Sequence, residues 1–207
     1  MKIIGLSGGI ASGKNSVAEI FSKLGVKIFD ADLIVHDLFI NNKIVIQQIA
    51  KQFPQAMKSS GIDRKIIAEI ITKNPQKLAI IENIIHPLVR NNYQQFLVYS
   101  NKSNEKLVIL NIPLLQEKKY YKTDKIIAII TDEEIRRNRY IKRSIADINK
   151  EDQIIISQLN EKFTLLKNQQ ISDEERIKIA DYVIKNNSNY QDLEQQVIAI
   201  FKKISNE

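Results

Sequence analysis

The sequence predicts an α/β fold in which a parallel, five-stranded sheet is covered by helices on both faces. Short apolar runs rich in β-branched residues recur along the 207 residues, and a segment of helical period or composition follows each run. Such an alternation of strand and helix is typical of a parallel sheet. The runs are continuously apolar, as strands buried on both faces require. They are residues 3–6, 26–29, 107–112, 126–130 and 182–184.

Length and composition indicate one folded domain, or one domain with an inserted lid. Hydrophobic residues make up 43% and charged residues 27% of the chain, and with only 6 Gly and 4 Pro a disordered or collagen-like chain is excluded. The absence of cysteine excludes disulfides, zinc–thiolate sites and thiol catalysis. Because His36 and His86 are the only histidines, a metal site must depend on oxygen ligands.

The net charge of +7 indicates an anionic partner, and nucleotide phosphate, nucleic acid and acidic lipid satisfy it equally. The 7 Tyr and 7 Phe form no array interleaved with basic residues, so we expect no nucleic-acid partner. No stretch approaches the ~18 to 20 apolar residues of a membrane span, and the first apolar run is too short for a signal-peptide core. We therefore expect no membrane partner and a cytoplasmic location.

A glycine-rich segment follows the first predicted strand, where residues 8–14 read G-G-I-A-S-G-K. Such a loop points several backbone N–H groups at one anion, the following helix adds its positive N-terminal end, and the lysine reaches the outer phosphates. An amphipathic segment begins directly after Lys14, which is the context that the motif requires. The sequence therefore predicts a nucleotide-binding loop formed by Gly8, Gly9, Ile10, Ala11, Ser12, Gly13 and Lys14.

Two residues depart from the strict form of this loop. Asn15 stands where Ser or Thr normally offers a hydroxyl to Mg²⁺; its amide carbonyl is also a neutral oxygen ligand, and Ser16 is a possible substitute. The alternative is that Asn15 is a first-turn helix residue and that phosphates and water hold the metal. A residue with a Cβ in left-handed geometry costs ~1 to 2 kcal/mol, so we expect Ala11 to have a negative φ.

Two carboxylates follow the second predicted strand, in the sequence Asp30-Ala31-Asp32. In sheets of this kind the carboxyl ends of neighbouring strands border one crevice, which would bring the pair near the terminal phosphate. A kinase needs one such acid to accept or orient the proton of the attacking hydroxyl. Either aspartate could instead cap the next helix. The preceding loop favours Asp32 for the reaction and leaves Asp30 as the candidate cap.

Residues 40–104 interrupt the alternation and are predicted to be helices only. Asn74 and Pro75 supply the N-cap and first-turn signals of a long helix that runs through residue 99. Proline is expected to kink or break that helix at His86, because Pro87 follows it. His86 fits a packed or capping residue as well as a ligand.

The segment Pro113-Leu114-Leu115-Gln116-Glu117 directly follows the third predicted strand and would lie at the same crevice as the loop. Its apolar residues could line a substrate pocket. Glu117 could equally be an acid on a helix surface.

A second long helical region, residues 132–170, carries a cluster of arginines: Arg136, Arg137, Arg139 and Arg143. Three of them are spaced to share one helix face, and planar guanidinium groups suit phosphate oxygens. We interpret this region as a lid that closes over bound nucleotide. A solvated surface helix is the alternative.

Six segments of the sequence resemble the dephospho-coenzyme A kinase family, over nearly the whole chain. Their order and spacing are far more specific than the loop alone. The segments are G-L-S-G-G-I-A-S-G-K (5–14), D-A-D (30–32), I-H-P (85–87), P-L-L-Q-E (113–117), R-Y-I-K-R (139–143) and A-D-Y-V-I-K-N-N (180–187).

The resemblance implies a three-layer P-loop kinase fold that uses ATP and Mg²⁺ to phosphorylate the ribose 3′-hydroxyl of dephospho-coenzyme A. It implies that Asp32 is the catalytic base, that Lys14 and the loop amides hold ATP, and that Arg139 and Arg143 close on the phosphates. Residues 180–187, with Asn186 as the nucleotide contact, would approach the adenine. The remaining implied contacts are Asn15 and Ser16 for the nucleotide and its metal, and Ser7, Arg64, His86, Pro113, Leu114, Leu115 and Glu117 for the substrate.

The expected organisation is a core of residues 1–39, 105–131 and 171–207, a helical substrate-binding subdomain of residues 40–104 and a lid of residues 132–170. We expect a monomer or a weak homo-oligomer. Besides Ala11 and Asn15, the chain departs from the family in Asn111, where an acid often ends the third strand, and in a longer segment between the lid and Asp181.

Two other functions compete with this interpretation. Another kinase of the same architecture, acting on a nucleoside or a small alcohol, is the stronger alternative. A regulatory GTPase is weaker: residues 149–152 match the guanine-reading N-K-x-D pattern, but they continue a basic helical segment instead of ending an apolar strand, and the sequence has no D-x-x-G switch.

Overall fold

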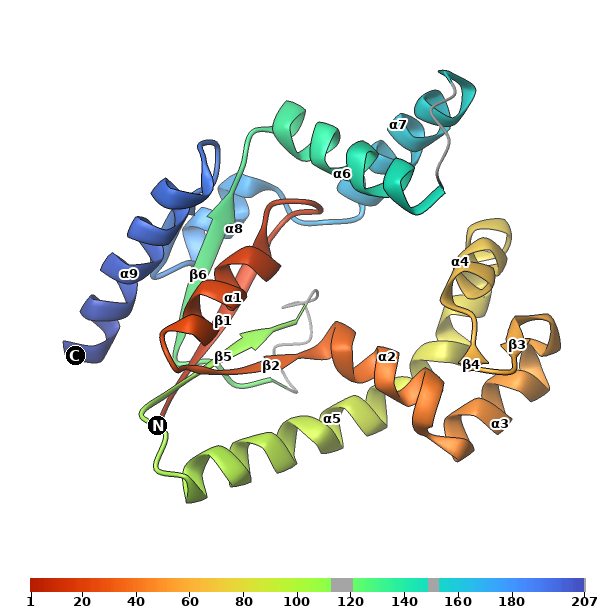
Figure 1. Cartoon of the computed structure of the whole chain (residues 1–207), viewed down its shortest axis with the longest axis horizontal. Coiled ribbons are helices and arrows are strands. Elements are labelled where there is room, and N and C mark those ends of the chain that lie inside the picture. The colour runs from red at the N-terminus through yellow and green to blue at the C-terminus, as the bar shows by residue number, and fades with distance from the viewer. Residues whose placement is uncertain (113–120, 149–152, 207) are drawn as a thin grey trace. The chain divides into compact units, whose positions relative to one another are not determined.

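The computed structural model describes residues 1–112, 121–148 and 153–206 of the chain (Figure 1). Contacts between Cα atoms divide the chain into two compact units. Unit 1 consists of Met1–Ile28 and Asn104–Glu207, and unit 2 consists of Phe29–Ser103. Every helix within the described residues is too short or too polar to span a lipid bilayer.

A five-stranded sheet runs in the order β2-β5-β1-β6-β7. β1 pairs in parallel with β5 on one side and with β6 on the other, and β6 pairs in parallel with β7. Parallel neighbours need crossover connections, which the intervening helices provide. The five predicted runs are confirmed as strands, with ends that differ by a residue or two. The strands are β1 (Lys2–Gly8), β2 (Lys27–Asp30), β5 (Leu107–Asn111), β6 (Lys125–Ile130) and β7 (Tyr182–Lys185).

The helices that cover this sheet are α1 (Lys14–Lys23), α8 (Asp173–Ile179) and α9 (Tyr190–Asn206). Alternate residues of a strand face opposite sides of its sheet. Ile4 and Leu6 of β1 are fully buried in a core shared with α1 and α9, whereas the Ser7 side chain contacts Arg176 of α8. Helices therefore cover both faces, as predicted, with α1 in front of the sheet and α8 behind it in Figure 1.

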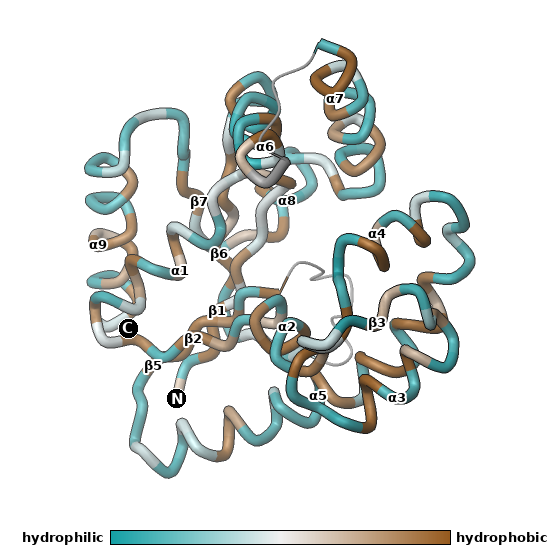
Figure 2. Tube along the Cα trace, turned by 45° about the vertical axis from the view of Figure 1, so that its right-hand side comes forward, coloured by the Kyte–Doolittle hydropathy of each residue, from teal (hydrophilic) through white to brown (hydrophobic). Residues whose placement is uncertain are grey.

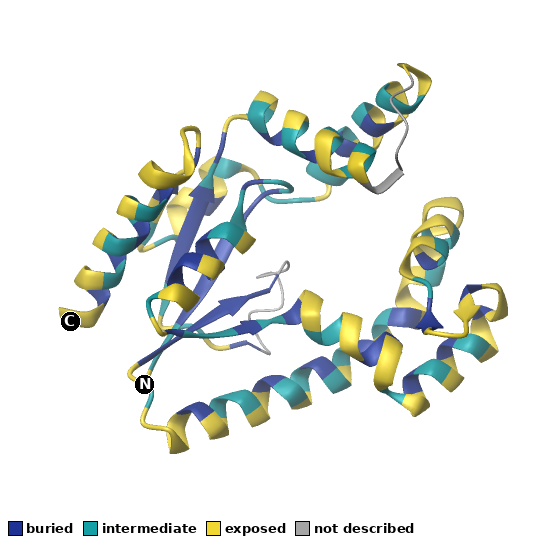
Figure 3. Ribbon diagram, in the orientation of Figure 1, coloured by how far each residue is buried: buried dark blue, intermediate teal, exposed yellow. Residues whose placement is uncertain are grey.

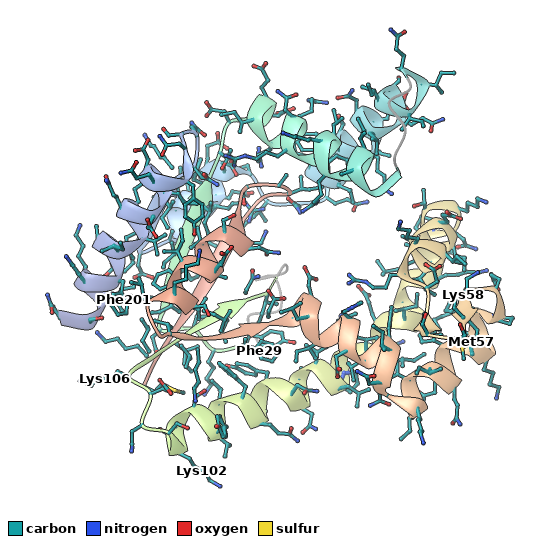
Figure 4. The ribbon with its side chains drawn as sticks, viewed as in Figure 1. Phe29, Met57, Lys58, Lys102, Lys106 and Phe201 are labelled. Atoms are coloured by element: carbon teal, nitrogen blue, oxygen red, sulfur yellow. The ribbon has the colours of Figure 1, made fainter. Side chains whose placement is uncertain are left out.

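The core between the sheet and its helices is continuous and apolar. Strands β1 and β6 are almost wholly buried, while α1 and α9 bury one stripe and expose the other, as Figure 3 shows. The tube in Figure 2 has the same alternation of hydropathy along α9. Phe21 of α1 meets Phe201 of α9 edge-on, with ring centroids 6.4 Å apart; Phe201 is labelled in Figure 4.

Two further helices of unit 1, α6 (Glu133–Ile148) and α7 (Gln153–Asn168), pack against each other. Their shared core contains Tyr140 and Phe163, whose ring centroids are 5.8 Å apart, and Leu159. Ile10 and Ala11 of the glycine-rich loop pack against this core. The helices that the sequence assigns to a lid therefore touch the loop through apolar side chains.

Unit 2 is mainly helical. Phe29, labelled in Figure 4, packs its ring against Tyr93 and Phe96, with centroid distances of 5.7 and 5.6 Å. The elements of unit 2 are α2 (Ala31–Asn41), α3 (Lys43–Gln52), the 3₁₀ helix η1 (Pro54–Ala56), β3 (Met57–Lys58), β4 (Gly61–Ile62), α4 (Arg64–Lys73), the 3₁₀ helix η2 (Pro75–Lys77) and α5 (Leu78–Lys102).

The prediction that residues 40–104 contain only helices is wrong in one place. β3 and β4 form a short antiparallel hairpin, in which Met57 pairs with Ile62. Gly61 makes the turn possible, because its φ of 112° is a conformation that side chains with a Cβ rarely adopt. A Cβ at this position would also overlap the backbone carbonyl of Phe39. Strands of two residues carry too little periodicity to be recognised in the sequence.

The sequence predicts that Pro87 kinks or breaks the long helix. No break occurs, since α5 includes Pro87 and continues past it. Proline removes one backbone donor, but α5 is 25 residues long and buries an apolar stripe on both sides of the proline. Its start is also different from the expectation: η2 precedes it, and Asn74 makes no side-chain cap hydrogen bond. The continuous packed stripe outweighs the loss of one hydrogen bond.

Candidate active site

The glycine-rich loop joins the end of β1 to the start of α1, which is the strand–loop–helix context that its motif requires. The Ser12 N–H donates to the Gly9 carbonyl at 3.1 Å and closes a turn. Gly13, at φ 97°, is the N-cap of α1 and supplies no side-chain cap. The first N–H groups of a helix have no partner within the helix, so those of α1 are available to an anion.

Three glycines of the loop are explained by what lies against them. A Cβ at Gly8 would overlap the Ser12 hydroxyl, one at Gly9 would overlap the Arg136 guanidinium, and one at Gly13 would overlap the Asn186 amide. The loop is therefore packed closely by side chains from α6 and from the segment after β7, in addition to its own residues.

Ala11 has a φ of 57°, so the expectation of a negative φ is wrong. The turn between Gly9 and Ser12 requires a left-handed residue here, and the sequence supplies alanine in place of glycine. The methyl group of Ala11 packs against the core between α6 and α7. This apolar contact offsets part of the conformational strain.

Replacing Ala11 with valine is expected to lower the free energy of unfolding by about 2 kcal/mol, because a β-branched side chain is an outlier at positive φ. Ala11→Gly is the matched control. It relieves strain but loses a packed methyl group and adds unfolded-state entropy, so its effect should stay below about 1 kcal/mol. Urea unfolding measures both, and a valine variant as stable as the original chain would contradict the positive φ.

Lys14 lies at the first position of α1 and turns its side chain back over the loop. Its Nζ donates to the Gly8 carbonyl at 2.7 Å. The ammonium group is thereby held on the side of the loop where the outer phosphates of a nucleotide would lie.

Asn15 and Asn111, two of the departures from the family pattern, are hydrogen-bonded to each other. The Asn111 Nδ2 donates to the Asn15 Oδ1 at 3.0 Å. Asn111 is buried at the end of β5, whereas Asn15 is exposed on α1. A carbonyl oxygen has two lone pairs, so the Asn15 Oδ1 keeps one for a hard cation. Within the described ranges, no group of three or more His, Cys, Asp or Glu side chains could hold a metal ion.

Asn186 anchors the far side of the loop. Its Nδ2 donates to the Ser12 carbonyl at 2.8 Å, and the Thr131 hydroxyl donates to the same carbonyl at 3.0 Å. Arg139 reaches the Asn186 Oδ1 at the long distance of 3.5 Å. Thr131, which is buried, was not predicted; a threonine directly after a predicted strand is the signal that could have found it.

The four lid arginines have different surroundings. Arg136 is buried beside Asp173 at 3.5 Å, and Arg143 is exposed. Arg137 bonds to Glu133 at 2.7 Å and stacks over the Phe163 ring at 4.9 Å. Its role is therefore to hold α6 on α7.

Two further charged residues of this region are Glu133 and Arg139. Hydrogen bonds from Lys167, and then from Arg137, lower the pKa of Glu133. The Arg139 Nη1 is buried with no hydrogen-bond partner among the described residues. A buried, unpartnered guanidinium nitrogen beside the loop suits an incoming anion.

Three polar residues near the loop were not predicted at all. Gln170 accepts a hydrogen bond from the Ile10 N–H at 2.8 Å, and Arg176 donates to the Ser7 hydroxyl at 3.0 Å. Asp173 lies between Arg136 and Arg176. No local pattern marks Gln170 and Arg176, because their partners Ile10 and Ser7 lie 160 and 169 residues away in the sequence.

The remaining predicted residues lie in unit 2. Asp30 is the N-cap of α2 and accepts from the Leu33 N–H at 3.1 Å, which confirms it as the capping residue. Asp32 is in the first turn of α2, exposed, and nothing in the described part of the chain bonds to its carboxylate. Arg64 is exposed at the start of α4, and His86 is half-buried in the middle of α5.

Some predicted residues fall outside the described ranges. They are Pro113, Leu114, Leu115 and Glu117, together with the N-K-x-D match at 149–152. The residues before that match belong to helix α6, whereas a guanine-reading motif should end an apolar strand.

A family model and two similar proteins that match this chain belong to one family. The family model described as dephospho-CoA kinase matches residues 2–192. A dephospho-CoA kinase of Fusobacterium nucleatum is 40% identical over 198 residues, which cover 94% of this chain and 94% of that protein. One from Bartonella quintana is 33% identical over 205 residues and covers 99% and 98%.

Solved structures show the same likeness. A dephospho-CoA kinase from Campylobacter jejuni superposes with a TM-score of 0.63 at 27% identity, covering 100% of this chain and 98% of that one. A Thermus thermophilus protein superposes with a TM-score of 0.71 at 27% identity, covering 98% and 97%. A shikimate kinase from Bacteroides thetaiotaomicron has a TM-score of 0.50 at 14% identity over 99% and 98%, a likeness of fold alone.

Proposed function

This chain belongs to the dephospho-CoA kinase family, and from that premise we propose how its own residues carry the reaction. The enzyme transfers the γ-phosphoryl group of ATP to the 3′-hydroxyl of dephospho-CoA, which gives CoA and ADP in the final step of CoA synthesis. In phosphoryl transfer the protein contributes mainly positioning and stabilisation of charge. The described residues are suited to those tasks.

The observation that carries the proposal is the wrapped loop at the start of α1, with Lys14 folded over it. The loop amides and the N-terminal N–H groups of α1 would hold the phosphates, and the Lys14 ammonium would neutralise them. Arg139 would add its free nitrogen from the lid side, with Arg143 closing on the phosphates, and Asn186 would border the adenine. Ser16, in the first turn of α1, would complete the nucleotide contacts.

Asp32 is proposed as the residue that orients the ribose 3′-hydroxyl and accepts its proton. Its carboxylate is free of local bonds among the described residues because Asp30 performs the capping of α2. It also follows directly on β2, and ligands of open parallel sheets bind outside the carboxyl ends of the strands.

The proposed substrate side consists of residues outside the loop. We propose residues 40–104 as the substrate-binding subdomain and 132–170 as the lid, with residues 1–39, 105–131 and 171–207 as the core. The proposed substrate contacts are Ser7, Arg64, His86, Pro113, Leu114, Leu115 and Glu117. The Ser7 hydroxyl accepts a bond from Arg176 and retains its own proton for a further one.

Magnesium fits the residues present at the loop. Mg²⁺ keeps several waters and prefers phosphate and a few protein oxygens, so the neutral Asn15 carbonyl meets its needs. When bound, the ion would neutralise charge on the transferring phosphates. We propose Asn15 as its protein ligand, direct or through water.

Asn15→Leu is expected to raise the Mg²⁺ concentration needed for half-maximal rate by at least about tenfold, because it removes the oxygen and keeps a similar size. Asn15→Ser is the control: it restores a hydroxyl at this position and should remain active. Titrating Mg²⁺ at saturating ATP measures both. An unchanged titration for Asn15→Leu would remove Asn15 from the metal site.

The function is tested by ADP release with dephospho-CoA, compared with nucleosides and with small alcohols related to shikimate. Turnover with dephospho-CoA alone supports the proposal, whereas preference for a nucleoside or a small alcohol would assign the chain to another P-loop kinase. We also propose a cytoplasmic enzyme that works as a monomer or weak homo-oligomer, without a nucleic-acid or membrane partner.

A further inference from the structure

We propose that Gln170 is a positioning residue for the phosphate-binding loop, and that Arg136, Gln170 and Arg176 together form an outer brace that holds this loop in its nucleotide-binding shape. None of the three needs to touch the nucleotide. The inference rests on the proposed role of the loop in binding ATP. It concerns unit 1 only, which contains the loop, α6, α7 and α8.

Gln170 makes the central contact of the outer brace. Its Oε1 accepts the Ile10 N–H at 2.8 Å, and this bond joins the end of the lid region to the loop. A Cβ at Gly9 would come to 3.5 Å from the same oxygen, so the side chain lies along the outer surface of two successive loop residues. The Gln170 backbone is itself fixed, because its N–H donates to the Lys167 carbonyl at 3.0 Å.

Arg176 fixes the base of the outer brace. Its Nη1 donates to the Ser7 hydroxyl at 3.0 Å in a buried position, and its Nη2 donates to the Ile171 carbonyl at 3.2 Å. Ser7 is two residues before Gly9, and Ile171 directly follows Gln170. One guanidinium therefore holds together the strand that leads into the loop and the residue that carries the Gln170 contact.

Arg136 closes the outer brace from α6. Its guanidinium lies directly against Gly9 and is paired with Asp173 at 3.5 Å, while Asp173 lies 3.6 Å from the Arg176 Nε. Two buried guanidinium groups thus share one carboxylate. Burial lowers the pKa of Arg176, Asp173 opposes this shift, and the positive charge of Arg136 adds to it. Arg136, Arg176 and Asp173 together carry a net positive charge on the outer side of the loop. This charge favours an anion bound by the loop.

The loop needs such support because of Ala11. A non-glycine residue at positive φ persists only when its surroundings hold it there. Ile10 is bonded to Gln170, and Ile10 and Ala11 both pack on the core between α6 and α7. The outer brace and this core hold the strained turn from one side, and the bonds of Asn186 and Thr131 to the Ser12 carbonyl hold it from the other.

Without the Gln170 acceptor, the loop should spend part of its time in other shapes, and nucleotide binding must then pay for reordering it. The expected result for Gln170→Met is about tenfold weaker ADP binding, with a matching rise in KM for ATP. The KM for dephospho-CoA should stay unchanged. A residue that only stabilised the fold would lower Tm without this selectivity.

Isothermal titration calorimetry with ADP tests the proposal on the full chain. Gln170→Met keeps the side-chain length and removes the acceptor, and the neighbouring exposed Gln169→Met is its matched control. Weaker binding in Gln170→Met alone supports the outer brace, and equal binding in both variants overturns it. If the original chain itself binds no ADP, the proposed function has failed instead.

A second measurement needs no variant and covers the case in which Gln170→Met does not fold. The Ile10 amide proton should exchange with solvent more slowly than exposed loop amides in the original chain, because Gln170 holds it. Fast exchange of the Ile10 amide would overturn the proposal. Arg176→Lys, which keeps the charge but not the two directed bonds, should weaken ADP binding in the same direction as Gln170→Met.

Discussion

Lys14→Met is expected to lower kcat/KM by about 1000-fold and to weaken ATP binding as well. The Lys14 ammonium is fixed over the loop by the Gly8 carbonyl, so it meets the phosphates in the ground state and in the transition state. Removing one preorganised donor from a site of developing charge commonly costs about 100- to 1000-fold. Methionine fills the space of the lysine stem, which leaves the loss of charge as the main change.

Steady-state kinetics and ADP calorimetry together measure this effect. Lys23→Met is the matched control, since Lys23 lies on the same helix and pairs at the surface with Glu19 at 2.8 Å. Exposed pairs contribute little to stability, so the control should keep nearly full activity. If Lys14→Met keeps turnover within a few-fold of the original chain, the loop is not the phosphate site.

Asp32→Asn is expected to lower kcat by about 100- to 10000-fold while leaving the KM values nearly unchanged. The amide keeps the shape of the carboxylate and removes its ability to take a proton from the ribose hydroxyl. Asp30→Asn makes the comparison within the same tripeptide. Asparagine caps a helix about as well as aspartate, so that variant should fold and turn over normally.

The rates of the two variants with ATP and dephospho-CoA decide between the aspartates. Asp37→Asn adds a control further along α2, where Asp37 accepts a bond from Asn41 at 2.6 Å. Near-normal kcat in Asp32→Asn would show that another group accepts the proton. A collapse in Asp30→Asn in place of Asp32→Asn would exchange their assigned roles.

The parts of the fold that the sequence predicted are those set by local pattern. Continuous apolar runs identified the five strands, and the loop motif between β1 and α1 needed only its own residues and their flanks. Asp30 as a cap follows from the position of its side chain one residue before a helix. The order of the family's segments identified the reaction, which no single segment could have done.

The parts that escaped prediction depend on contacts between distant segments. A general steric cost suggested a negative φ for Ala11, but the turn between Gly9 and Ser12 requires a positive φ, and packing on α6 and α7 offsets part of the cost. The bonds of Gln170 and Arg176 to the loop region, like the bond between Asn15 and Asn111, join residues far apart in the chain. Proline in α5 illustrates the same point, since tertiary packing decides whether a helix continues.

The bond between Asn15 and Asn111 has a consequence for the acid limb of a pH–rate profile. Side-chain amides do not titrate in water, so this pair keeps the same charge at every pH at which the chain stays folded. In a relative with a carboxyl group at the end of this strand, that group and the catalytic base would both be protonated along the acid limb. Their effects on the rate would then overlap. Here the end of β5 contributes no such overlap, which leaves the acid limb as a cleaner measure of the carboxyl group that receives the ribose proton.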